Sequence, residues 1–191
     1  MDNNKDEASA LAQAAIESTR DWFERVVLGL NLCPYAHQPA KSGRVRFTAF
    51  IEGPEENLFE RLEREVLRLE QSPADALETT LVILPEGFED FYFYLSVLER
   101  VEHWLRKTGK EGVFQVASFH PQYVFHGAKP DDRGNLTNRS PYPVLHLLRE
   151  QSLAEIIDGG ADTQAIPARN IARLTVLSES DIDALFPYLK P

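Results

Sequence analysis

Apolar residues recur at the spacing of a helix face in several long segments of the chain. The segment 9–30 carries Leu11, Ile16, Trp22, Phe23, Val26, Val27 and Leu30 at intervals that place them on one side of a helix. This pattern predicts a long amphipathic helix that stops near Pro34, because proline disfavours helical geometry in the residue before it. A second helix is predicted to start at Gly53-Pro54, and a third covers Glu89–Lys107.

Three apolar runs alternate with these helices and predict strands. They are Val45–Ile51, Thr79–Leu84 and Val113–Phe119. Strands that alternate with helices indicate parallel βαβ units with right-handed crossovers. We therefore expect an α/β fold with a small, mainly parallel sheet of three or four strands, packed by helices. The alternative is a ferredoxin-like α+β arrangement.

The pattern changes after the third strand. The segment 126–138 is rich in Gly, Pro, Asp and Asn, which predicts a long loop, and long loops in compact domains are often functional. Helices are predicted at 143–157 (one helix, or two broken at a capping box that starts at Ser152), 167–176 and 179–188. These form an expected C-terminal helical cluster within one globular domain, residues 9–191, preceded by a disordered tail, residues 1–8.

Composition narrows the partners and the compartment. The 191 residues are 43% hydrophobic and carry a formal net charge of -10, which repels nucleic acid and anionic membrane surfaces, although a local basic pocket could bind a small anion. The single cysteine, Cys33, cannot form an intramolecular disulfide. No signal peptide and no apolar run of about 20 residues is present, so we expect a soluble, cytoplasmic protein.

The ends of the predicted strands are candidate site positions, because ligands bind beyond the carboxyl ends of parallel strands. Glu52, Glu86 and His120 follow the three strands. For the two carboxylates, the favoured interpretation is a solvated loop position or a helix cap. His120 stands between a strand and Pro121, and its ordinary pKa of ~6.5 suits a general acid or base. The alternative for His120 is a hydrogen-bonded structural histidine.

The segment before the predicted 143–157 helix is a candidate anion site. The first amides of a helix lack internal partners and attract negative charge. Asn138 and Ser140 can bind those amides or a ligand, and Arg139 can hold a carboxylate or phosphate through two parallel bonds. The alternative is an ordinary helix cap braced by Arg139.

Three more residues of that predicted helix are spaced so that they share one face. They are His146, Arg149 and Glu150, which could complete an anion-binding site or form a solvated face with local ion pairs. Cys33 is a candidate nucleophile. It follows a helix, however, and the partially negative end of a helix raises a thiol pKa, so a buried, unreactive cysteine is the alternative.

Metal and nucleotide motifs give little support to a cofactor. Possible metal ligands are His120, His126, Asp131, Asp132 and His146, but their spacing matches no dedicated metal motif. The chain has no Gly-x-Gly-x-x-Gly and no Walker sequence. The sequence therefore predicts no metal site and leaves any cofactor unknown.

Three motifs resemble a known family. TRDWFERVVLGLNLCPYA (residues 19–36), QVASFHPQYVF (115–125) and NRSPYPVLHLLRE (138–150) are similar to the pattern of an uncharacterised bacterial family, catalogued as domain of unknown function 1415. The resemblance covers residues 18–185. It implies no activity, substrate or cofactor, and no functional residue can be transferred from it.

Two functions fit these observations. One is an enzyme that acts on a small anionic metabolite by hydrolysis or acyl transfer, with His120 as acid or base, Cys33 or water as nucleophile, and Arg139 holding the anion. The other is a non-catalytic binding or scaffold protein in which the same polar segments form a structural hydrogen-bond network.

Overall fold

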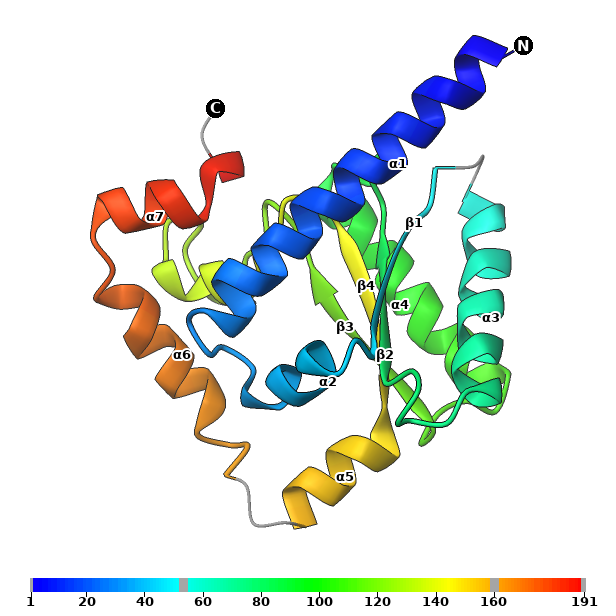
Figure 1. The fold of residues 1–191 in the computed structure, drawn as a ribbon. Coiled ribbons are helices and arrows are strands. Elements are labelled where there is room, and N and C mark those ends of the chain that lie inside the picture. The colour runs from blue at the N-terminus through cyan, green and yellow to red at the C-terminus, as the bar shows by residue number, and fades with distance from the viewer. Residues whose placement is uncertain (1, 52–54, 159–161, 190–191) are drawn as a thin grey trace.

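A mixed four-stranded sheet lies at the centre of the part of the chain that the computed structural model describes, residues 2–51, 55–158 and 162–189 (Figure 1). Its strands are β1 (Val45–Ala49), β2 (Thr79–Ile83), β3 (Phe114–Phe119) and β4 (Val144–Arg149). Their order in the sheet is β1-β2-β4-β3.

Only one of the three strand pairings is parallel. β1 pairs parallel with β2, whereas β4 lies antiparallel to both β2 and β3. The first three strands therefore run in the same direction, as the βαβαβ pattern predicts, but β4 is inserted between the second and the third. The expected mainly parallel sheet is wrong for this reason. The element order also differs from the β-α-β-β-α-β order of a ferredoxin-like fold.

Helices surround this sheet. The helical elements are α1 (Asp2–Trp22), the π-helix η1 (Phe23–Leu28), the 3-10 helix η2 (Pro34–Ala36), α2 (His37–Lys41), α3 (Glu55–Gln71), α4 (Phe91–Lys107), the 3-10 helix η3 (Arg133–Asn138), α5 (Glu150–Asp158), α6 (Ile166–Thr175), α7 (Glu179–Leu185) and the 3-10 helix η4 (Pro187–Leu189). Within the described ranges, no helix is both long and apolar enough to cross a membrane.

Alternating strand residues build a core on each face of the sheet. Val82, Leu145 and Leu147 pack with the apolar sides of α3 and α4. Leu81 and Val144 belong to the opposite face, which α1 and η1 cover. Figure 1 shows α1 and α3 on opposite sides of the sheet. The complete burial of β2 fits its central position and confirms the interpretation of Thr79–Leu84 as a strand buried on both faces.

We expected the segment Pro143–Ile157 to be helical throughout. It is instead a strand followed by a helix. Val144–Arg149 forms β4, and α5 begins at Glu150. Leucine favours helices intrinsically, but pairing with strands on both sides outweighs this preference in β4. As a consequence, no helix starts at Ser140.

The N-terminal end of the described chain differs from its prediction, whereas the C-terminal helices agree with theirs. α1 begins at Asp2, within residues 1–8 that we expected to be a disordered tail, and neither glycine nor proline interrupts the sequence before Gly29. The predicted C-terminal helices are present as α6 and α7. They return to the end of the N-terminal helix: Arg25 donates to Ala184 O (2.8 Å), and Arg173 donates to Leu30 O (2.5 Å).

Candidate functional site

A pocket of about 740 Å³ lies on the α1 face of the sheet. We call it the sheet pocket. Its apolar wall comes from the end of α1, η1, the sheet and α5, and includes Trp22, Phe23, Val27, Leu81, Ala117, Phe119, Leu148 and Leu153. Its polar lining includes Cys33, Tyr35, Gln38, Arg44, Asp75, Glu78, Thr79, His146, Arg149, Ser152 and Glu155. The pocket is therefore apolar at its base and bears a limited set of reactive or charged groups.

His146 lies in the middle of this face. On β4 it is in register with Leu81 of β2 and with Ala117 of β3, so the central strand position directs it to the α1 side. Its Nε2 is 2.7 Å from Thr79 Oγ1, and that hydroxyl donates to Leu147 O at 2.5 Å. Because the hydroxyl proton goes to the carbonyl, Thr79 accepts from the Nε2–H of His146.

This assignment leaves Nδ1 of His146 with a lone pair. Within the described ranges, no hydrogen bond to this atom is present. Burial lowers the pKa of His146 from 6.5 to about 4, so the imidazole is neutral at pH 7. A neutral imidazole with an unused acceptor, in the wall of a pocket, can bind a hydroxyl or N–H group or accept a proton from it.

Cys33 also lines the sheet pocket. It follows the N-terminal helix, as the sequence indicates, but it is also the N-cap residue of η2, a position that the sequence analysis missed. Burial raises the pKa of the Cys33 thiol, while the backbone N–H groups of Tyr35 and Ala36 act in the opposite direction. The thiol is thus protonated at neutral pH, and no hydrogen bond joins it to His146 in the described structure.

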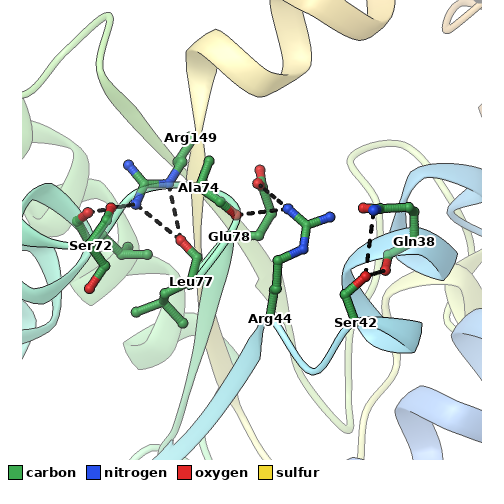
Figure 2. A network of polar contacts seen from close by, with 9 residues as sticks. Gln38, Ser42, Arg44, Ser72, Ala74, Leu77, Glu78 and Arg149 are labelled. Carbon is green, nitrogen blue, oxygen red and sulfur yellow. Dashed lines mark hydrogen bonds and ion pairs between the residues drawn. The ribbon is translucent and has the colours of Figure 1, made fainter.

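Arg44 closes one side of the pocket, just before β1. Its Nη1 donates to Ala74 O at 2.7 Å and lies 3.4 Å from Glu78 Oε2. Figure 2 shows the guanidinium between Glu78 and Ala74 on one side and Gln38 on the other. The Arg44 and Glu78 side chains are only 13% and 15% exposed, so this ion pair is held largely out of water. Its remaining N–H groups make no hydrogen bond to any described residue.

Arg149, unlike Arg44, binds several backbone carbonyl groups and so stabilises the fold. Its Nη2 donates to Leu69 O (2.5 Å), Ser72 O (2.7 Å) and Leu77 O (3.0 Å), near the end of α3 (Figure 2). Leu69 O, in the last turn of α3, also accepts from the N–H of Ser72 (3.2 Å), so the guanidinium caps this turn together with that N–H. It also binds the segment that follows α3, through Ser72 O and Leu77 O. In a strand, residues three apart point to opposite faces, so Arg149 leaves β4 on the opposite side from His146, although both side chains line the sheet pocket. The predicted shared helix face of His146, Arg149 and Glu150 is wrong.

Comparison with known proteins agrees with the motif resemblance. The family model described as "Protein of unknown function (DUF1415)" matches residues 14–184, which is most of the chain. The chain belongs to the DUF1415 family. No curated protein and no solved structure is similar enough to count as a match.

In this DUF1415 chain, His120 lies outside the sheet pocket. Its side chain is fully buried, its Nε2 donates to Phe88 O (3.0 Å), and its Nδ1 accepts from the N–H of Gln122 (3.0 Å). Its ring also packs against Phe91 and Tyr94. Burial lowers the pKa of His120, although the Phe88 carbonyl and the charges of Asp90 and Glu89 oppose this. Both ring nitrogens are occupied, so the geometry favours the structural alternative for this histidine.

The other predicted anion-site residues belong to the same hydrogen-bonded region. Asn138 O accepts from the N–H of His120 (3.0 Å), and Asn138 Nδ2 donates to Ser118 O (2.9 Å). Arg139 donates to Tyr123 O (3.2 Å) and Pro130 O (2.7 Å). The helix start on which the predicted anion site depended is absent, because Ser140 precedes a strand and donates to Tyr142 O instead (2.5 Å).

The predicted residues thus divide between two places. The sheet pocket of the DUF1415 chain is lined by three of them, Cys33, His146 and Arg149. Four others contact the loop after β3: His120, Asn138, Arg139 and Ser140. Glu150 belongs to neither group. Sequence reasoning missed Arg44, Thr79 and Glu78. A polar Thr at the start of a buried strand was the available signal for Thr79.

The residues considered as metal ligands do not assemble. In residues 2–51, 55–158 and 162–189, no group of three or more His, Cys, Asp or Glu side chains could hold a metal ion. Glu52, one of the predicted strand-end residues, lies outside the described residues, and Glu86 is exposed.

Proposed function

We propose that this protein binds a small organic molecule, with an apolar body and one polar head group, in the sheet pocket. The observation that carries the proposal is the neutral His146 imidazole in the wall of an otherwise largely apolar hollow of about 740 Å³. Pockets for small molecules typically have roughly 300–1,000 Å³, mainly apolar walls and a few well-placed polar groups.

The charges around the pocket favour a neutral head group. Arg44 is paired with Glu78, and Arg149 is committed to the carbonyls near the end of α3. Asp75 and Glu155 are exposed carboxylates at the pocket lining. A hydroxyl or amide N–H can donate to His146 Nδ1 without displacing any of these groups. An anionic ligand, which the sequence suggested, could reach the unused N–H groups of Arg44, but Glu78 already balances the charge of that guanidinium.

A second candidate function is hydrolysis or acyl transfer in the same pocket, because Cys33 and His146 both line it. The sulfur would attack a carbonyl carbon as its proton passes to His146, the leaving alkoxide would take that proton, and water would then cleave the thioester. The raised pKa of Cys33 and the lowered pKa of His146 oppose this proton transfer. Binding without covalent chemistry is therefore the better-supported function.

The binding proposal can be tested with a matched set of phenyl compounds that differ only in the head group: an alcohol, a carboxamide, a carboxylate and an amine. We expect the alcohol and the carboxamide to bind more tightly than the carboxylate, with dissociation constants of about millimolar for such small ligands. Protein NMR titration gives affinity and location together. Perturbations centred on the network around His120, or none with any compound, would contradict the proposal.

Two variants provide a matched pair for this titration. Ala117→Phe fills the pocket from β3 and should weaken binding at least tenfold, whereas Ala154→Phe places the same ring on the exposed side of α5 and should leave binding unchanged. If Ala117→Phe does not fold, the wild-type NMR map alone decides the location.

For the second candidate, p-nitrophenyl butyrate is a suitable probe. An acyl-transfer enzyme would release p-nitrophenol in a burst that is lost in Cys33→Ala, whereas we expect hydrolysis at the same slow rate in both proteins. A burst that depends on Cys33 would make the catalytic function the better account.

A further inference from the structure

A second hollow, of about 400 Å³, lies beside β1 at the edge of the sheet. Three arginines from three elements line it: Arg20 of α1, Arg46 of β1 and Arg68 of α3. Since α1 and α3 cover opposite faces of the sheet, these side chains converge around its edge. We call this group the edge arginines. The hollow that the edge arginines line shares no charged residue with the sheet pocket.

One buried carboxylate partly compensates the edge arginines. Glu65 is 2% exposed, and Arg46 donates to it through Nε (2.8 Å) and Nη2 (3.2 Å), while Arg68 Nε lies 3.7 Å away. Arg20 instead lies over the ring of Phe47, with its guanidinium carbon 4.9 Å from the ring centre. The three arginines bring three positive charges to the hollow, and the carboxylate of Glu65 neutralises one of them. No acidic residue of the described structure lines the hollow itself, so two positive charges remain uncompensated there.

This charge is opposite in sign to that of the whole chain, whose formal net charge is -10. Gathering like charges around one hollow is unfavourable unless a counter-charge is present. Donors are also left over: in the described structure, Nη1 of Arg46 and both terminal nitrogens of Arg68 make no hydrogen bond. Guanidinium groups with unused N–H donors match the oxygens of a phosphate group, which they bind through parallel hydrogen bonds.

We propose that the edge arginines bind a phosphate group, either as free phosphate or as the end of a phosphate monoester. A phosphate carries about two negative charges near neutral pH, which matches the uncompensated charge of the hollow. A neighbouring hollow of about 480 Å³ shares Arg20, Gly43, Val45 and Phe47. It is also lined by the apolar residues Phe23, Leu28 and Ala40 and by the polar residues Glu24, His37 and Lys41. The organic part of a monoester would contact these apolar side chains.

Titration of the protein with inorganic phosphate, at constant ionic strength set by sodium chloride, tests this site. The readout is the NMR signal of the arginine Nε–H groups. We expect saturable shifts for the edge arginines and at least tenfold weaker binding in the double variant Arg20→Gln/Arg68→Gln. Both side chains are exposed, so the variant should fold. Arg64→Gln, an exposed arginine on the same helix α3, is the matched control and should bind like wild type.

A second arm uses phenyl phosphate. Tighter binding than inorganic phosphate identifies a monoester site, and equal binding identifies a site for the free ion. A wild-type response no larger than that to chloride would overturn the proposal, as would saturable binding that the double variant leaves unchanged. Because the sheet pocket is a separate hollow, neither result bears on the function proposed for it.

Discussion

Single arginines stabilise this fold by binding the carbonyl groups that helices leave without partners at their C-terminal ends. Arg149 binds carbonyls near the end of α3, Arg133 donates to Thr175 O (3.1 Å) at the end of α6, and Arg173 donates to Leu30 O (2.5 Å) after η1. The net charge of -10 does not indicate this role, because these arginines bind backbone carbonyl groups of the same chain.

Loss of the Arg149 cap should be strongly destabilising. Arg149→Met keeps much of the apolar stem but leaves Ser72 O and Leu77 O without this donor and removes one of the two donors to Leu69 O. We expect a decrease of about 2–4 kcal/mol in the free energy of unfolding, measured with urea. Arg106→Met, on the exposed face of α4, is the control and should change it by less than about 0.5 kcal/mol. Equal effects of the two substitutions would contradict the capping role.

His146 should make stability depend on pH. Its pKa is lowered from 6.5 in the unfolded chain to about 4 in the folded protein, so the unfolded state binds more protons between these values. Above pH 6.5, His146 is neutral in both states and does not lower the free energy of unfolding. As the pH falls from 6.5 towards 4, protonation of His146 in the unfolded chain lowers this free energy progressively. From this group we expect about 2 kcal/mol lower stability at pH 5 than at pH 7.

The variant His146→Gln tests that dependence, because glutamine can still donate to Thr79 but does not titrate. The decrease between pH 7 and pH 5, measured by urea unfolding, should be smaller in His146→Gln than in wild type, and unchanged in the exposed control His103→Gln. His120, whose pKa is also lowered, keeps part of the dependence in both variants. An identical pH profile for wild type and His146→Gln would show that this imidazole is not neutralised by burial.

At the scale of elements, the N-terminal helix ends in an irregular turn that forms part of the pocket wall. Residues Phe23–Leu28 form a π-helix, with Gly29 N–H donating to Glu24 O (3.0 Å), and this wide turn carries Phe23 and Val27 into the pocket wall. Single π-turns inside helices occur frequently at functional sites. Periodicity predicted a helix here, but it cannot distinguish a π-turn from a regular one.

Gly29 makes this turn possible. Its backbone angles are those of an α-helix, where alanine is normally favoured by ~1 kcal/mol. A Cβ at this position, however, would lie 2.2 Å from the carbonyl oxygen of Arg25. We therefore expect Gly29→Ala to lower the free energy of unfolding by about 1–3 kcal/mol. The measurement is urea unfolding, with Ala14→Gly on the exposed side of α1 as the comparison. A stabilised Gly29→Ala protein would contradict the π-turn geometry.

Three strands could be predicted from the sequence because apolar runs bounded by Pro and Gly carry local information. Val45–Ile51, Thr79–Leu84 and Val113–Phe119 correspond closely to β1, β2 and β3. The fourth could not, since Val-Leu-His-Leu-Leu-Arg is a short apolar run whose periodicity fits a helix or a strand. This segment forms a strand because it pairs with β2, whose residues lie 60 or more positions earlier in the sequence.

For the whole molecule, inserting β4 between β2 and β3 changes where a ligand can bind. The rule for open parallel sheets directed attention to the carboxyl ends of the strands and thus to His120. The sheet is mixed, and the pocket lies over its α1 face near the amino ends of β1 and β2, at Arg44 and Thr79. The sequence suggested Cys33 as a nucleophile and His146 as an anion-binding residue, but only the topology brings them to one pocket.

We propose that the sheet pocket around His146, rather than the network around His120, is the functional site. The most direct test is NMR of the protein with ¹⁵N-labelled histidine during titration with 3-phenylpropan-1-ol. We predict a saturable shift of His146 Nδ1, from an imidazole that starts neutral with its proton on Nε2, and no shift of His120. Binding that perturbs His120 and leaves His146 unchanged would contradict it.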